Sequence, residues 1–206
     1  MIQLPVIEMF YSLQGEGKNS GTAAYFIRLA GCNVGCGFCD EKRAWSVDKA
    51  KMQSIEQIIR KVKESNARNV VVTGGEPTLY NLTCLTHELR ASGVNTFLET
   101  SGVNEITGYW DWITVSPKKY KPVLDSVLHK ADEIKVVISE KDDFLFAQAI
   151  RRRRAALLKP STDKAVYCLQ PEYSSLCEIL PLTVEYIKEN PLWRLSLQTH
   201  KMIGIK

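Results

Sequence analysis

The sequence lacks the features that mark several large classes of protein. No run of about 18 apolar residues is present, as a membrane-spanning helix would need. The first residues show no charged segment followed by an apolar one, so no secretion signal is expected. The formal net charge is only +4, far from the basic surface of a dedicated nucleic-acid-binding protein. We therefore expect a cytoplasmic protein with no membrane partner and no direct contact with nucleic acid.

Nucleotide-binding fingerprints and internal repeats are missing as well. The chain has neither a glycine-rich dinucleotide motif nor a Walker motif, and no low-complexity segment or linker divides it. Its 206 residues, of which 45% are hydrophobic, are enough for one core of ordinary size. We expect a single domain over residues 1–206.

Three cysteines are clustered in one short segment in the pattern CxxxCxxC, at Cys32, Cys36 and Cys39. Gly35 and Gly37 interrupt any helical or strand period, so the segment is predicted to be a tight loop. Three thiolates in a loop can hold a soft metal ion or an iron–sulfur cluster. A closed zinc site and a ferredoxin-type cluster each need four protein ligands. Three cysteines therefore favour a 4Fe-4S cluster whose fourth iron is open to another ligand.

Two other interpretations of these cysteines stay open. A zinc loop can take its fourth ligand from a distant residue such as His200, as in a zinc-stabilised RNA-binding module. The three cysteines can also be unrelated reduced thiols. The remaining cysteines, Cys84, Cys168 and Cys177, are expected to be small core residues.

Apolar strands alternate with amphipathic helices along most of the chain. Strands are predicted over residues 5–11, 23–29, 69–73, 96–100, 112–115, 133–138, 165–169 and 194–198, and helices over about 55–65, 79–89, 122–130, 142–154 and 181–189. The first two strands are expected to pair as a hairpin. Arg151–Arg154 are expected on a solvated face of the fourth helix, and together with Lys159 they place positive charge at its negative end. The alternation predicts an α/β fold with a mostly parallel sheet.

Polar residues or glycines follow one predicted strand after another. They are Gly74-Gly75-Glu76, Glu99-Thr100-Ser101, Ser116-Pro117-Lys118, Gln170-Pro171 and Gln198-Thr199-His200. In β/α barrels the active site is built from the carboxyl ends of the strands. The cysteine loop follows the strand over 23–29, so we expect it to open onto the same site.

These motifs resemble the 7-carboxy-7-deazaguanine synthase family of the radical S-adenosylmethionine superfamily. CxxxCxxC after the first barrel strand and Gly-Gly-Glu-Pro after the second are typical of the superfamily. The segments 12–17 (SLQGEG), 26–33, 99–102, 115–118 and 193–201 narrow the resemblance to the family. It extends from about residue 5 to the C-terminus. It implies a modified, incomplete radical-SAM (β/α)6-type barrel with mostly parallel strands.

The resemblance implies a lyase reaction. Cys32, Cys36 and Cys39 would hold a 4Fe-4S cluster that binds S-adenosylmethionine at its open iron. One electron from an external donor such as flavodoxin would yield a 5′-deoxyadenosyl radical, which takes hydrogen from C6 of 6-carboxy-5,6,7,8-tetrahydropterin. Ring contraction and loss of ammonia would give 7-carboxy-7-deazaguanine, which feeds queuosine-type tRNA bases and related deazapurines. The family precedent adds a homodimer.

The resemblance also implies two sets of binding residues. The cofactor set is Phe38, Cys39, Asp40, Gly75, Glu76, Ser116, Pro117, Lys118 and Gln170, and the substrate set is Leu13, Gln14, Gly15, Glu16, Arg28, Thr73 and Lys206. For Gln14 and Glu16 a solvated turn is the alternative interpretation. A guanidinium in an apolar strand, as at Arg28, needs an anionic partner, and the resemblance makes that partner the substrate carboxylate.

Position 41 departs from the family pattern. The family has Thr or Ser after Cys-Asp, and that hydroxyl helps bind a magnesium ion next to the substrate carboxylate; this chain has Glu41. A carboxylate suits Mg2+ well, so Glu41 either binds the ion or points away and removes the metal dependence. An activating enzyme for a glycyl-radical protein is the nearest alternative activity because it shares CxxxCxxC. The segments SLQGEG and Gln198–Lys201 favour the synthase family instead.

Overall fold

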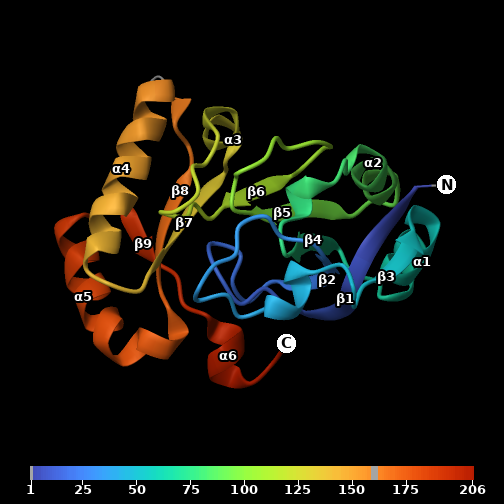
Figure 1. The fold of residues 1–206 in the computed structure, drawn as a ribbon, viewed down its shortest axis with the longest axis horizontal. Helices are drawn as coiled ribbons and strands as arrows, with labels where there is room; N and C mark the ends of the chain where they lie inside the picture. Colours follow the sequence, from blue (N-terminus) through green and yellow to red (C-terminus); the bar gives the residue numbers. More distant parts are fainter. Residues whose placement is uncertain (1, 159–161) are drawn as a thin grey trace.

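The computed structural model describes residues 2–158 and 162–206, which form one nine-stranded sheet flanked by helices (Figure 1). The strands are β1 (Gln3–Leu13), β2 (Ala23–Leu29), β3 (Lys51–Ser54), β4 (Asn69–Gly74), β5 (Asn95–Thr100), β6 (Trp112–Val115), β7 (Glu133–Ile138), β8 (Val166–Pro171) and β9 (Trp193–Leu195). The α-helices are α1 (Ile55–Glu64), α2 (Thr83–Ala91), α3 (Asp125–Lys130), α4 (Asp142–Leu157), α5 (Leu176–Glu189) and α6 (Thr199–Ile203). Single 3-10 turns are η1 (Lys42–Trp45), η2 (Pro77–Leu79) and η4 (Tyr173–Ser175).

The sheet is mostly parallel and open. Its order is β3-β1-β2-β4-β5-β6-β7-β8-β9; β1 pairs antiparallel with β2 and β3, and every pair from β2–β4 to β8–β9 is parallel. The predicted hairpin and the predicted incomplete barrel are therefore confirmed. Among the described residues β3 and β9 are the two edges, so strand pairing does not close the barrel.

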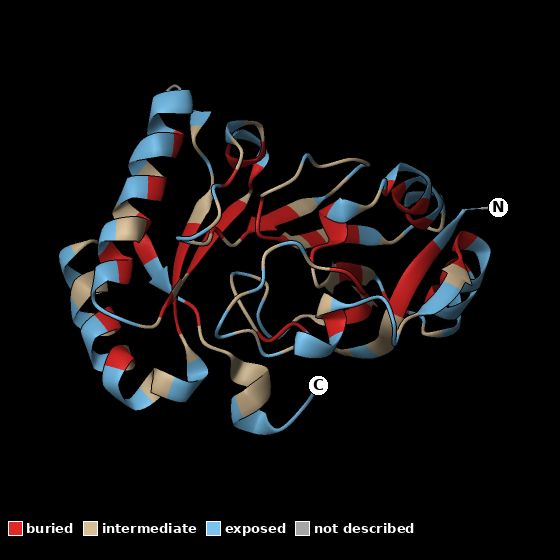
Figure 2. Cartoon of the chain, viewed as in Figure 1, coloured by how far each residue is buried: buried red, intermediate tan, exposed pale blue. Residues whose placement is uncertain are grey.

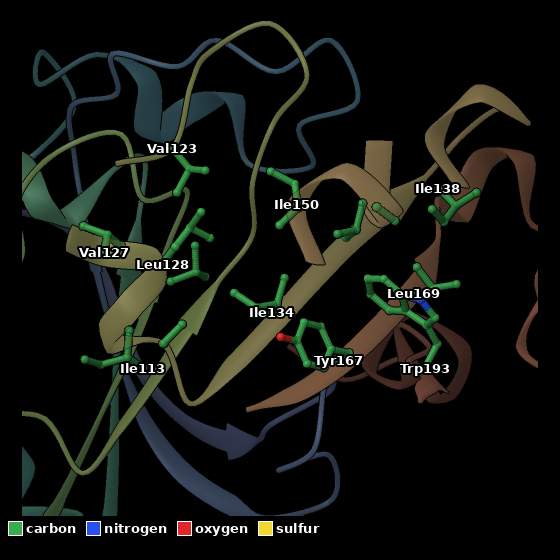
Figure 3. Packing of buried hydrophobic residues seen from close by; sticks show 14 of the residues in the cluster. Ile113, Val123, Val127, Leu128, Ile134, Ile138, Ile150, Tyr167, Leu169 and Trp193 are labelled. Atoms are coloured by element: carbon green, nitrogen blue, oxygen red, sulfur yellow. The ribbon is translucent and has the colours of Figure 1, made fainter. Parts of the chain in front are cut away.

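The core follows from the apolar strands. In β4, Val70, Val71 and Val72 are all fully buried, as expected for a parallel strand covered on both faces. One apolar cluster lies between β1, β2, β4 and helices α1 and α2, and another lies between β5–β9 and helices α3–α5 (Figure 3). Buried residues run along the strands and on the sheet-facing sides of the helices, whose outer sides are exposed (Figure 2). None of the helices of the described chain is long and apolar enough to cross a membrane.

The helix predicted over 55–65 forms for the expected local reason. The Ser54 hydroxyl accepts the Gln57 amide and the Gln57 side chain accepts the Ser54 amide, which completes a capping box. Short edge elements were missed: the sequence predicted neither β3 nor α6. The last strand was predicted to reach residue 198, but β9 ends at Leu195.

Three further predictions are corrected by the structure. The helix predicted to start at Pro181 begins at Leu176, and Pro181 lies inside it. Proline has no N–H, so the Cys177 carbonyl one turn earlier lacks its helical hydrogen bond, and Cys177 is exposed to water. Cys84 is also exposed, so only Cys168 of the three remaining cysteines is a core thiol. Arg154 is buried and donates to Asp163 at 3.1 Å, while Lys159 lies outside the described residues.

Candidate active site

Two adjoining hollows lie at the carboxyl ends of the parallel strands. We call them the cluster pocket, which the three cysteines of the loop line, and the charged pocket, which contains Arg28. The cluster pocket also takes in Phe38, Gly75, Glu76, Ser116, Lys118 and Gln170, and the charged pocket takes in Gln14, Thr73, Glu41 and Lys206. The two hollows share Glu16, Cys39, Asp40 and Glu99. The residues predicted from the sequence are thus brought together, with three exceptions described below.

The cysteine loop presents three free thiols to the cluster pocket. The Cys39 amide donates to the Cys36 carbonyl at 3.1 Å, and the Cys32 amide donates to the Trp45 carbonyl at 3.1 Å. The Val34 amide points at Cys32 Sγ (3.4 Å) and the Trp45 indole N–H at Cys39 Sγ (3.3 Å). Burial raises the pKa of the Cys39 thiol, and hydrogen bonds from the Glu41 backbone and the Trp45 indole act against that rise. Donors aimed at sulfur suit thiolate ligands.

The three cysteine sulfur atoms do not lie close enough together to share one zinc ion. Thiolates bound to one zinc at about 2.3 Å lie within roughly 4 Å of one another. Within the described chain the trio of potential ligands that meets a 4.8 Å limit is Glu16, Asp40 and His200, not the three cysteines. As they are placed, the three thiols therefore do not form a site for a single zinc ion.

Gly74 and Gly75 let the end of β4 lie directly against the cysteine loop. Gly74 has φ +149°, and a Cβ atom on it would be 2.1 Å from the Leu29 carbonyl oxygen. A Cβ atom on Gly75 would be 2.3 Å from the Gly31 oxygen and 2.5 Å from the Ala44 oxygen. Only glycine permits this approach, which aligns the turn after β4 with the loop that carries the cysteines.

Glu76 organises the next part of the site. Its side chain is buried, and its carboxylate accepts hydrogen bonds from the backbone and hydroxyl of Thr78, the hydroxyl of Thr100, and the backbone and hydroxyl of Ser101. These five donors satisfy a buried charge. Because the carboxylate is fully used, Glu76 holds the ends of β4 and β5 at a fixed distance beside the cluster pocket.

Lys118 and Ser116 line the same pocket from the end of β6. Lys118 Nζ donates to Ser116 Oγ at 2.6 Å and lies 5.5 Å from the centre of the Phe38 ring. Burial lowers the pKa of Lys118. Pro117, between them, faces a neighbouring hollow that Phe38 and Tyr120 also line.

Lys135 lies at the junction of the two pockets and was missed from the sequence. Its side chain is 5% exposed, and its Nζ is 2.6 Å from Glu16 Oε2 and 3.1 Å from Glu99 Oε2. Burial raises the pKa of Glu99 to about 7 even though Lys135 opposes the rise. Burial also acts to raise the pKa of Glu16, but Lys135 together with hydrogen bonds from Gln198 and Gln170 outweighs it and lowers that pKa to about 2. The signal in the sequence was a lysine in the strand over 133–138, whose other residues after Glu133 are apolar.

Gln14 and Glu16 do not form a solvated turn. Gln14 is buried and donates to Glu99 Oε1 at 3.1 Å, and Glu16 accepts from Lys135 and from Gln198 (2.7 Å). Both side chains therefore belong to the floor of the site.

Arg28 already has an anionic partner within the chain. Its Nε lies 3.0 Å from Glu8 Oε1 and 3.9 Å from Glu41 Oε2. Glu8 lies opposite Arg28 in the β1–β2 pairing, and Lys206 Nζ also contacts Glu8 at 2.8 Å. Glu8 was missed because the register of a hairpin cannot be read from the two strands separately.

Glu41 has the donor chemistry for magnesium, but Arg43 holds it. Arg43 donates to both Glu41 oxygens, at 2.7 and 2.5 Å. The Arg43 side chain is 61% exposed and can turn into solvent. An ion at Glu41 would take the place of that guanidinium.

Pro117 is the first of the three exceptions, and the other two, Leu13 and Gly15, lie where the C-terminal segment meets the SLQGEG turn. Leu13 is exposed at the end of β1. The Gly15 carbonyl accepts the Thr199 amide and hydroxyl, both at 2.9 Å, and a Cβ atom on Gly15 would be 2.2 Å from His200 Nδ1. Gly15 therefore allows the C-terminal segment, with His200, to pack beside the charged pocket.

Comparison with known proteins agrees with this geometry. Residues 26–127 match the Radical SAM superfamily. A 7-carboxy-7-deazaguanine synthase from Flavobacterium psychrophilum is 43% identical over 98% of this chain and 92% of its own length. The enzyme of that name from Escherichia coli is 38% identical over 99% of this chain and 100% of its own length. The chain belongs to the 7-carboxy-7-deazaguanine synthase family.

The fold is that of the same family. The crystal structure of QueE from Escherichia coli superposes with a TM-score of 0.85 at 35% identity, over 96% of this chain and 95% of that one. The protein is accordingly a radical S-adenosylmethionine lyase whose cofactors are a 4Fe-4S cluster and S-adenosylmethionine. Neither the glycyl-radical activating enzyme nor the zinc-stabilised RNA-binding module is supported by these comparisons.

Proposed function

We propose that this chain converts 6-carboxy-5,6,7,8-tetrahydropterin into 7-carboxy-7-deazaguanine with loss of ammonia, in the formation of queuosine-type and other 7-deazapurines. One observation carries the proposal: the pocket lined by the three cysteines shares four lining residues with a pocket that contains a guanidinium and a buried amide. A cofactor in the first pocket and a carboxylated heterocycle in the second would meet at the shared residues.

Different residues of the cluster pocket bind the two cofactors. Cys32, Cys36 and Cys39 would hold the cluster, one ligand fewer than a closed four-cysteine site. When bound, the cluster and S-adenosylmethionine supply the one-electron chemistry that starts the reaction. The remaining cofactor contacts are Phe38, Asp40, Gly75, the backbone of Glu76, Ser116, Lys118 and Gln170, whereas Pro117 lines the neighbouring hollow.

The residues of the charged pocket orient the pterin. Arg28 binds the substrate carboxylate as a bidentate donor once the hydrogen bond from its Nε to Glu8 is released. Gln14 offers an amide to the edge of the heterocycle, and Glu99, with a pKa of about 7, can hold or accept a proton at its carboxyl oxygen near neutral pH. The remaining substrate contacts are Glu16, Thr73 and Lys206, whereas Leu13 and Gly15 do not line this pocket.

Further parts of the proposal rest on the family resemblance. They are a Mg2+ ion at Glu41, an external electron donor such as flavodoxin, a homodimer and a single radical SAM domain over residues 1–206. Reduced thiols in a cluster loop fit a cytoplasmic location.

The test is anaerobic reconstitution with iron and sulfide, followed by turnover with S-adenosylmethionine, a reductant and the carboxylated tetrahydropterin. Formation of the deazaguanine is expected from the wild-type protein and from Cys84→Ala, whose thiol is exposed away from the site. Cys36→Ala is expected to lose the cluster and all turnover. Cleavage of S-adenosylmethionine without any change in the pterin would refute the substrate while leaving the cofactors in place.

A further inference from the structure

The three cysteines of the loop differ in the hydrogen bonds that their sulfur atoms receive. Cys32 Sγ is approached by a backbone amide, that of Val34, at 3.4 Å. Cys39 Sγ is approached by a side-chain donor, the indole N–H of Trp45, at 3.3 Å. A side-chain donor can be removed by mutation without changing the course of the backbone, so this contact can be tested in isolation.

Trp45 is fixed by the chain around it. It ends the turn η1, and its carbonyl accepts the Cys32 amide at 3.1 Å. The preceding residue, Ala44, is fully buried, and its carbonyl packs against Gly75. Trp45 therefore contacts both ends of the cysteine loop, by its backbone at Cys32 and by its ring at Cys39, and it lines the cluster pocket.

A hydrogen bond to a ligating sulfur changes the reduction potential of the cluster. Three thiolates already place negative charge around the iron, and reduction adds one more. An N–H dipole aimed at the sulfur stabilises the more negative state, so it raises the reduction potential. Its effect is strengthened in a partly buried site, where water screens the dipole less.

We propose that Trp45 is a positioning residue that raises the reduction potential of the cluster through its N–H bond to the Cys39 sulfur. The inference rests on the proposed role of Cys39 as a cluster ligand. It concerns the ease of the first electron transfer and is independent of which substrate occupies the charged pocket.

The experiment uses anaerobically reconstituted full-length protein without S-adenosylmethionine. Two variants remove the donor: Trp45→Phe, and replacement of Trp45 by 3-benzothienylalanine, which keeps the shape of the double ring and lacks only the N–H. The control is Trp110→Phe, because the Trp110 indole donates to the Thr107 carbonyl at 2.9 Å and not to a cysteine. Iron and sulfide content establish loading, and a redox titration followed by electron paramagnetic resonance gives the midpoint potential.

Both Trp45 variants are expected to load the cluster and to show a midpoint potential more negative than the wild-type value, while Trp110→Phe keeps that value. If Trp45→Phe loads poorly but the benzothienyl protein loads with a more negative potential, the inference stands. An unchanged potential in the loaded benzothienyl protein would overturn it, without affecting the proposed reaction. Failure of the wild-type protein to take up a cluster would overturn both.

Discussion

Replacement of Lys135 by methionine probes the charge balance at the junction of the two pockets. The lysine is 5% exposed and contacts two carboxylates, Glu16 at 2.6 Å and Glu99 at 3.1 Å. Removing one partner of a buried ion pair costs about 3–5 kcal/mol, because the other charge is left without compensation. We expect Lys135→Met to lower the free energy of unfolding by about that amount at pH 8.

The cost should depend on pH in a direction that the pKa values fix. Glu16, with a pKa of about 2, is ionised in the native protein throughout the range from pH 5 to pH 8. Glu99, with a pKa of about 7, is neutral at pH 5 and mostly ionised at pH 8. In the variant the pKa of both carboxyl groups rises, because Lys135 lowers both of them in the intact protein. Proton uptake can therefore relieve the unpaired charge more readily at pH 5 than at pH 8. The destabilisation should be smaller at pH 5 than at pH 8.

Urea unfolding of the reduced apoprotein, followed by tryptophan fluorescence at both pH values, measures this difference. Glu16→Gln combined with Lys135→Met is the matched control, because it removes the unpaired charge and should recover part of the loss. A loss below about 1 kcal/mol, or an equal loss at pH 5 and pH 8, would refute the view that Lys135 organises these carboxylates.

Three further predictions concern single positions. The raised pKa of Glu99 means that its protonated form contributes stability below about pH 4.5, and this contribution is lost as the pH rises through 7. At 1.36 kcal/mol per pH unit the loss is at most about 3 kcal/mol. In Glu99→Gln the free energy of unfolding, measured over the same pH range, should not show this loss. Gly75→Ala places a methyl group 2.3 Å from a backbone oxygen. It should lower the free energy of unfolding by about 1–3 kcal/mol and impair cluster loading. Gly37→Ala, with open space around it, should do neither. Arg43→Gln frees the carboxylate of Glu41 and should lower the Mg2+ concentration needed for half-maximal turnover; an unchanged requirement would argue against Glu41 as a magnesium ligand.

The sequence predicted the parts of the protein that depend on local patterns. The runs of valine and isoleucine at 69–73 and 133–138 predict parallel strands because such strands are buried on both faces. The cysteine spacing predicts the loop because all three ligands lie within eight residues.

Contacts between distant elements could not be predicted in the same way. Lys135 meets Glu16 and Glu99 only because β7, β5 and the turn after β1 converge in space. The edge strand β3, with the sequence Lys-Met-Gln-Ser, has no β-branched or aromatic residue to mark it, and its strand form depends on pairing with β1. Glu8 opposite Arg28 likewise follows from strand register.

The open side of the sheet has a consequence for local motion. There the turn over residues 14–20 contacts the segment after β9 through hydrogen bonds that involve hydroxyl groups. Examples are the bond from Gly17 N–H to Ser196 Oγ (2.8 Å) and the bond between Ser20 Oγ and Thr199 Oγ1 (3.2 Å). Each such bond contributes only about 0.5–1.5 kcal/mol, so this junction can separate without breaking any strand pair. Amide hydrogens at Gly17 and Thr199 should therefore exchange with solvent through local opening, well before those of β4, which require unfolding of the sheet.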